Sequence, residues 1–196
     1  MDLSDSLKRV AIFGGSFNPI HNGHIALAQT VIAQDLADEV WLMVSPQNPL
    51  KAQTDLVDEN QRFALAQKAL VEVEGVSASD FEFQLPRPSY TWKTLEALRY
   101  ECPRIEFSLL IGGDNWTVFD RWANGEEILR HHRLIVYPRE GSPIDSNTLP
   151  SQVQLLEAPL FPYSSTDIRK AIRNNEDTSA MLPAVILDDC KRIYAQ

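Results

Sequence analysis

Apolar runs typical of strands alternate along this sequence with segments that have the hydrophobic spacing of helices. The expected strands are 9–13, 38–44, a segment near 81–85, 105–113, 133–138 and a segment near 153–158. The expected helices are 21–37, 59–73, 90–101, one that ends near 132, 165–174 and 182–195. Strands separated by helices form parallel βαβ units, and continuous apolar strands are typical of a sheet covered on both faces. The sequence therefore predicts an α/β fold with a parallel sheet flanked by helices.

Length and charge limit the classes of protein further. The chain has 196 residues, of which 44% are hydrophobic, so one core suffices and we expect a single domain over 1–196. Its net charge of -9 argues against a broad surface for nucleic acid. No signal-peptide pattern and no run near the ~20 apolar residues of a membrane span is found. We therefore expect a cytoplasmic protein that binds neither nucleic acid nor membrane. Cys102 and Cys190 lack disulfide or zinc spacing, and we assign them no role.

The segment 12–25, IFGGSFNPIHNGHI, joins the first expected strand to the first helix. In open parallel sheets, ligands bind beyond the carboxyl ends of the strands. Gly14 and Gly15 remove side chains where the chain leaves the strand, so an anion can approach main-chain amides and the helix N-terminus. The segment lacks both G-x-G-x-x-G and the P-loop pattern, which disfavours the usual dinucleotide fold and P-loop NTPases. It predicts a phosphate-binding loop, with a plain tight turn as the alternative.

Two of the four histidines, His21 and His24, stand three residues apart in this segment. At that spacing in a first helical turn, both side chains point to the same side. No carboxylate or cysteine stands nearby at metal-ligand spacing, so we predict no metal site in the protein. The pattern favours imidazoles that donate hydrogen bonds to phosphate oxygens.

Two further segments follow expected strands. Ser164, Ser165 or Thr166 can cap a helix whose exposed amides attract anions, and Arg169 lies about one turn inside it. Asp114 follows two glycines at a strand end, where a carboxylate can accept hydrogen bonds from ribose hydroxyls. An ordinary helix cap with a solvated arginine, and an Asx turn, are the respective alternatives.

The stretch GGSFNPIHNGH resembles the HxGH signature of nucleotidyltransferases, which transfer a nucleoside monophosphate from a triphosphate. More narrowly, the chain is similar to the bacterial nicotinate-nucleotide adenylyltransferases. Four more segments resemble that family in order, namely SPQNPLK (45–51), SYTWKTL (89–95), IGGDNW (111–116) and YSSTDIR (163–169). The resemblance implies a Rossmann-like, doubly wound parallel sheet of the nucleotidyltransferase type. It also implies a reaction of ATP with nicotinate mononucleotide that gives nicotinate adenine dinucleotide and pyrophosphate.

The resemblance also implies roles for single residues. The implied catalytic residues are His21, His24 and Arg169. The implied ATP-binding residues are Gly14, Gly15, Ser16, Phe17, Asn18, Gly112, Asp114, Ser164, Ser165 and Thr166. The implied mononucleotide-binding residues are Lys51, Thr91, Trp122 and Arg139, with Trp122 against the nicotinate ring. Leu50 and Glu140 depart from the family pattern, which has His before the lysine and Pro after the arginine. Mg²⁺ is the implied cofactor, carried with the ATP phosphates.

The implied reaction needs no general base, because the attacking phosphate monoester is largely dianionic near neutral pH. Several alternatives stay open: an adenylyltransferase for nicotinamide mononucleotide or phosphopantetheine, or a non-enzymatic nucleotide-sensing domain. The phosphopantetheine family typically has Thr where His21 stands, and the intact His21, His24 and Arg169 argue against a degenerate sensor. A homo-oligomer also stays open.

Overall fold

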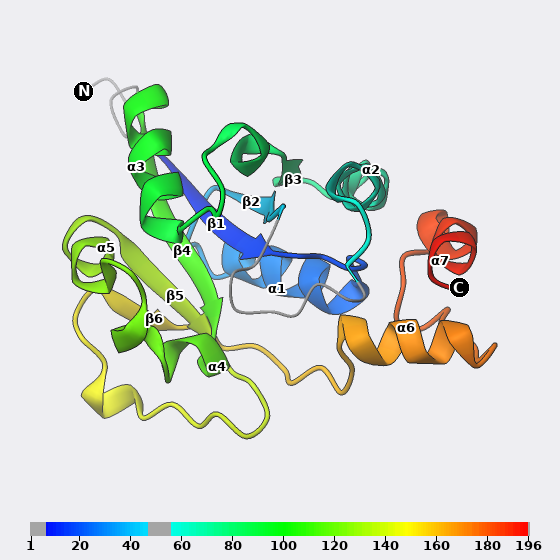
Figure 1. The fold of residues 1–196 in the computed structure, drawn as a ribbon. Coiled ribbons are helices and arrows are strands. Elements are labelled where there is room, and N and C mark those ends of the chain that lie inside the picture. Colours follow the sequence, from blue (N-terminus) through cyan, green and yellow to red (C-terminus); the bar gives the residue numbers. More distant parts are fainter. Residues whose placement is uncertain (1–6, 47–55, 196) are drawn as a thin grey trace.

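The computed structural model describes residues 7–46 and 56–195, which build one six-stranded parallel sheet (Figure 1). Its strands are β1 (Lys8–Gly15), β2 (Glu39–Val44), β3 (Val76–Ser79), β4 (Ile105–Gly112), β5 (Arg133–Tyr137) and β6 (Val153–Leu155). The strand order is β3-β2-β1-β4-β5-β6. The chain therefore adds strands in one direction from β1 and then in the other, which confirms the doubly wound sheet. Its topological switch point lies between β1 and β4, where ligands of such folds bind.

Helices cover both faces of this sheet, and Figure 1 shows α1 and α3 on opposite sides of it. The helices are α1 (Asn22–Ala33), α2 (Glu59–Leu70), α3 (Thr91–Glu101), α4 (Gly113–Trp116), α5 (Gly125–His131), α6 (Ser165–Arg173) and α7 (Leu187–Tyr194). Short 3-10 helices occupy Phe81–Gln84, Phe119–Arg121, Ser146–Thr148 and Ala184–Ile186. Within the described ranges, no helix is long and apolar enough to cross a membrane.

Two buried apolar clusters lie on the two faces of the sheet. Along β1, Ala11 and Phe13 belong to one cluster, whereas Val10 and Ile12 belong to the other. This division follows from the alternation of side chains along a strand. Buried residues of α1, α2, α6 and α7 complete the first cluster, and those of α3 and α5 complete the second. The site described below lies at the carboxyl end of β1, on the side of the first cluster.

The strand expected near 81–85 is wrong. The third strand is Val76–Ser79, and Phe81–Gln84 forms a 3-10 helix instead. The spacing of the two phenylalanines resembles a strand, but Glu82 between them is buried and its carboxylate accepts hydrogen bonds from the hydroxyls of Ser89 and Thr94. These contacts come from residues later in the chain, so local spacing does not reveal them.

Three helix boundaries also differ from expectation by three residues or more. Helix α2 ends at Leu70 rather than 73. Helix α1 ends at Ala33 rather than 37, because Asp35 adopts a left-handed φ of 56° and the Leu36 amide donates to the Val31 carbonyl. This turn satisfies carbonyls that the helix end would leave unpaired. The last helix begins at Leu187 rather than 182, since Ala184–Ile186 is a 3-10 turn.

Candidate active site

Gly14 and Gly15 are the last residues of β1, where they pair with Met43 and Val44 of β2. The expectation that they follow the strand is therefore wrong by two residues. A Cβ at Gly14 would meet nothing within 4 Å, so this exposed backbone is open to a ligand. A Cβ at Gly15 would lie 3.1 Å from the ring of Phe17. Glycine at this second position lets the loop that follows fold back closely on the strand.

The loop between β1 and α1 is held by contacts from distant parts of the chain. Phe17 is 2% exposed with a left-handed φ of 43°, and its ring lies edge-on to Phe13 at 5.6 Å. The Asn18 Oδ1 atom accepts hydrogen bonds from the Val57 amide at 3.3 Å and the Tyr194 hydroxyl at 2.9 Å. Burial raises the pKa of Tyr194, so its hydroxyl remains a donor. The side chains of Phe17 and Asn18 therefore shape the loop.

His21 and His24 lie together at the start of α1, as their spacing predicts. Their rings stack with centroids 3.6 Å apart and planes inclined by 22°. The main-chain N–H of His21 donates to His24 Nδ1 at 3.3 Å. A neutral His24 therefore carries its proton on Nε2, which makes that atom a hydrogen-bond donor.

His21 differs from its neighbour because it is buried, with 6% exposure. Burial, and next the positive charge of Arg139, lower its pKa to about 4. Its Nδ1 atom is buried and has no hydrogen-bond partner among the described residues. Burial therefore keeps the His21 ring neutral at pH 7.

The pH dependence of stability tests this burial. Because the folded-state pKa of His21 lies below 6.5, the unfolded chain binds the proton more readily, and stability falls as the pH drops from about 6.5 towards 4. We expect the parent to lose about 2 kcal/mol more than His21→Gln between pH 7 and pH 5. Urea denaturation of both proteins at the two pH values measures the difference. Parallel losses would show that His21 is not buried as the neutral form.

Helix α6 begins beside the same loop, and its first turn is capped as the sequence predicts. The Asp167 amide donates to Ser164 Oγ at 3.3 Å, and the Ser164 amide donates to Asp167 Oδ2 at 2.9 Å. The Ser165 hydroxyl donates to the Pro19 carbonyl at 2.9 Å. These bonds place the positive end of the α6 dipole next to the loop that follows β1.

Arg169 lies one turn into α6 and joins this helix to the loop. Its guanidinium donates to the Asn18 carbonyl at 2.8 Å and to Thr166 Oγ1 at 3.4 Å. Its Nε atom is buried with no hydrogen-bond partner in the part of the chain that the structure describes. Two hydrogen bonds therefore hold the Arg169 side chain in place, and its Nε–H has no acceptor within the described residues.

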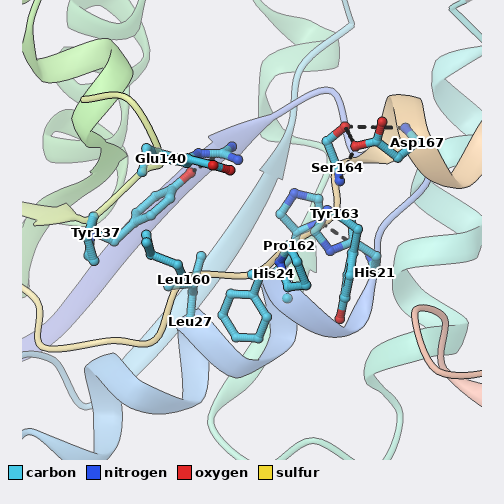
Figure 2. A pocket seen from close by; sticks show the side chains of 14 residues that line it. His21, His24, Leu27, Tyr137, Glu140, Leu160, Pro162, Tyr163, Ser164 and Asp167 are labelled. Carbon is cyan, nitrogen blue, oxygen red and sulfur yellow. Dashed lines mark hydrogen bonds between the residues drawn. The ribbon is translucent and has the colours of Figure 1, made fainter. Parts of the chain in front are cut away.

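A pocket opens between these elements (Figure 2). Figure 2 shows the side chains of His21, His24 and Tyr163 close together, with Ser164 and Asp167 at the α6 end. The full lining is His21, Gly23, His24, Leu27, Tyr137, Pro138, Arg139, Glu140, Leu160, Phe161, Pro162, Tyr163, Ser164 and Asp167. The pocket thus brings two histidines and a helix N-terminus together at the carboxyl end of the sheet, which is an arrangement suited to binding phosphate groups.

Arg139 enters the pocket from the segment after β5. Its guanidinium lies over the ring of Tyr137 at 5.4 Å, and its Nε atom is 3.7 Å from Asp114 Oδ1. A Cβ at Gly112 would come within 2.3 Å of the same Asp114 oxygen, so a side chain there would displace the Asp114 carboxylate. The structure therefore forms an ion pair between two residues that follow neighbouring strands, Asp114 after β4 and Arg139 after β5.

Of the predicted residues that the structure describes, His21, His24, Arg139 and Ser164 line this pocket, and Arg169 and the others do not. Thr91 begins α3, as expected, and Trp122 packs on Phe119 with ring centroids 5.2 Å apart. The indole Nε1 of Trp122 is buried without a hydrogen-bond partner among the described residues. Neither Thr91 nor Trp122 lines the pocket of Figure 2. Lys51 and Leu50 lie outside the described residues.

Several residues that support the site were not singled out from the sequence. Tyr163 lies edge-on to His21 at 5.5 Å, and its place directly before the α6 cap could have suggested it. Glu82 fixes the start of α3 by accepting from Ser89 and Thr94. Arg62 contacts the loops after β1 and β2. Glu82 and Arg62 carry no local signal, since their partners are distant in sequence.

Paired histidines and a helix N-terminus, placed beside the switch point of a doubly wound sheet, are typical of enzymes that transfer nucleotides. The sequence matches the cytidylyltransferase-like family over residues 12–171, and the chain belongs to that family. Within it, the chain belongs to the nicotinate-nucleotide adenylyltransferases, as similarity to individual relatives shows.

Two curated relatives and one solved structure illustrate this similarity. A protein of Bacteroides thetaiotaomicron named "Probable nicotinate-nucleotide adenylyltransferase" is 47% identical over 93% of this chain and 91% of its own. A protein of Bacteroides fragilis with the same name is 47% identical over 96% of this chain and 92% of its own. The nicotinic acid mononucleotide adenylyltransferase of Plasmodium falciparum, solved with NaAD, superposes with a TM-score of 0.76 over 96% of this chain and 100% of that one. At 17% identity, this last likeness shows the fold alone.

Proposed function

We propose that this enzyme transfers the adenylyl group of ATP to nicotinate mononucleotide, in the synthesis of NAD. The names of its relatives support this reaction. The observation that carries the proposal is the stacked pair His21 and His24 beside the capped start of α6. That combination offers hydrogen-bond donors and a positive dipole to a chain of phosphates.

In the proposed reaction, a phosphate oxygen of nicotinate mononucleotide attacks the α-phosphorus of ATP. A new P–O bond forms there, the bond to the β-phosphate bridging oxygen breaks, and that oxygen leaves with pyrophosphate. The attacking group is already an anion, so no side chain has to remove a proton. The protein aligns two anionic substrates and neutralises charge that develops on the α-phosphate and the leaving group.

Each residue has a specific part in this scheme. His24 Nε2, the buried His21 and Arg169 contact phosphate oxygens of ATP, while Ser164, Ser165 and Thr166 close around them at the α6 start. Gly14, Gly15, Ser16, Phe17 and Asn18 offer their main chain to ATP, and Gly112 allows Asp114 to reach the ribose. Thr91, Trp122, Arg139 and Lys51 bind the mononucleotide.

Mg²⁺ enters the proposed reaction with ATP, held by phosphate oxygens and water. Among the residues that the structure describes, no group of three or more His, Cys, Asp or Glu side chains could hold a metal ion. Asp114 pairs with Arg139, and Asp167 caps Ser164, so two of the carboxylates near the pocket are already engaged. The residues near the pocket are therefore compatible with an Mg²⁺ ion that would be bound by ATP and brought in with it. Bound there, Mg²⁺ would offset negative charge on the phosphates that leave as pyrophosphate.

One assay panel tests the proposed function. The purified protein is incubated with Mg²⁺ and ATP together with nicotinate mononucleotide, nicotinamide mononucleotide or phosphopantetheine, and pyrophosphate release and product mass are measured. We expect the highest kcat/KM with nicotinate mononucleotide. Preference for another acceptor would move the protein to a sister activity, and ATP binding without pyrophosphate release would identify a nucleotide sensor.

Arg169→Lys tests the role of the guanidinium. Lysine keeps the charge but lacks the planar fork that can hold Asn18, Thr166 and phosphate at once. We expect kcat/KM for ATP to fall roughly 10- to 30-fold, as for one lost charge-assisted bond of about 1.5 to 2 kcal/mol. The exposed Arg173→Lys, one turn further along α6, serves as the control and should match the parent. Equal activity of Arg169→Lys at all ATP concentrations would reduce Arg169 to a structural residue.

A further inference from the structure

Arg62, on the first turn of α2, is a fully buried cation that the proposed reaction does not use. Its guanidinium donates to four main-chain carbonyls. The Nε atom binds the Val57 oxygen at 2.7 Å, Nη1 binds the oxygens of Ser16 and Ser45, and Nη2 binds the Pro46 oxygen at 3.3 Å. No acidic side chain in residues 7–46 and 56–195 forms an ion pair with it.

Packing alone does not explain an arginine at this place. A buried charge without a counter-ion is costly, and an apolar side chain of similar volume would fill the same space. Burial lowers the pKa of Arg62, which is the direction expected when water is removed from a cation. What the guanidinium provides, and an apolar residue cannot, is a set of fixed donors for three separate segments of main chain.

These segments meet at the carboxyl ends of β1 and β2. Ser16 begins the loop between β1 and α1, Ser45 and Pro46 follow β2, and Val57 precedes α2. The Ser45 amide also donates to the Gly15 carbonyl at 2.8 Å. The Gly15 carbonyl therefore accepts from the Ser45 amide after β2, and the Ser16 carbonyl accepts from Arg62 of α2.

The orientation of the peptide plane gives these bonds a consequence. In a trans peptide, the carbonyl and the following N–H point in opposite directions. A Ser16 carbonyl held by Arg62 thus turns the Phe17 N–H away from α2. The positive charge of Arg62 lies directly behind the same peptide, where little water screens it.

We propose that Arg62 is a positioning residue for ATP: it fixes the start of the loop after β1 with the Ser16 carbonyl turned towards α2, and its charge favours the anion bound on the other side of that peptide. This proposal rests on the proposed function for the identity of the anion. Arg62 itself touches no substrate and acts through the Ser16 peptide.

Two substitutions at Arg62 and one control test the proposal. Arg62→Met removes the charge and all the donors, whereas Arg62→Lys keeps the charge on a compact group that cannot reach four carbonyls. Leu70→Ala, at the other end of α2, removes a buried side chain of the same helix without touching the loops. We expect KM for ATP to rise about tenfold or more in Arg62→Met and about threefold in Arg62→Lys. KM for nicotinate mononucleotide should rise less than KM for ATP in both Arg62 variants, and both KM values should stay within twofold of the parent in Leu70→Ala.

The split between the two substrates separates positioning from simple loss of stability. Equal KM values for ATP in Arg62→Met and the parent, or the same rise in Leu70→Ala, would overturn the proposal. If Arg62→Met does not fold, an unchanged KM for ATP in Arg62→Lys would overturn the proposal instead. Calorimetric titration of each protein with ATP alone keeps the test independent of the acceptor. A parent that binds ATP but does not use nicotinate mononucleotide would refute the proposed function and still allow Arg62 to be judged.

Discussion

His24→Ala is expected to lower kcat by a factor of about one hundred or more. In the structure, the His21 main-chain N–H occupies His24 Nδ1, so a neutral ring carries its proton on Nε2. In the proposed reaction, that donor faces charge that grows on the phosphates as the transition state forms. Loss of one oriented donor at a developing charge costs roughly 3 kcal/mol of activation free energy. Steady-state assays with saturating ATP and nicotinate mononucleotide measure the effect.

Two more substitutions identify which ring nitrogen matters. Gln places its amide nitrogen near the position of Nε2, and Asn places it near Nδ1, so His24→Gln should retain more activity than His24→Asn. The ring of His24 also packs on Phe17 at 5.0 Å, so we expect the alanine variant to lose about 1 kcal/mol of stability. Near-normal turnover, or complete unfolding, of His24→Ala would remove its catalytic assignment.

Nicotinate mononucleotide should be preferred over its amide analogue by roughly a hundredfold or more in kcat/KM. Thr91 and Trp92 begin α3, and the first amides of a helix have no partner within it. The hydroxyl of Thr91 is a further donor at the same helix start. We place the nicotinate carboxylate at these donors. A carboxylate accepts from all of them, whereas a carboxamide turns an NH2 group towards at least one.

The expected ratio follows from the cost of that mismatch. A lost charge-assisted bond costs about 1.5 to 3 kcal/mol, and an unpaired buried donor adds about 1 to 3 kcal/mol. At about 1.4 kcal/mol per factor of ten, the smallest total corresponds to a factor of about sixty, and most of the range lies well above a hundredfold. Competition between the two mononucleotides at limiting ATP, with both products quantified, gives the ratio directly. Comparable kcat/KM values would refute the preference and indicate an enzyme of dual specificity.

The sequence predicted the sheet and the first loop well because their signals are local. The apolar strands and the spacing of His21 and His24 each lie within a few residues, and the structure confirms the doubly wound sheet and the pairing of the rings. The strand expected near 81–85 failed because Phe81 and Phe83 have strand-like spacing while the contacts of Glu82 decide the backbone. Arg62 was missed for the same reason, since one arginine on an amphipathic helix is normally a surface residue. The roles assigned to single site residues stay predictions.

The bond between Asn18 and Tyr194 has a consequence for the order in which this protein matures on the ribosome. It joins the loop after the first strand to the last helix, α7, across 176 positions of sequence. A growing chain can form β1 and α1 early, but the Tyr194 hydroxyl reaches Asn18 only after nearly the whole chain has emerged. Arg169 and Ser165, which hold the same loop, also come late in synthesis. Nascent chains should therefore acquire nucleotide affinity only after α6 and α7 have emerged from the ribosome and docked.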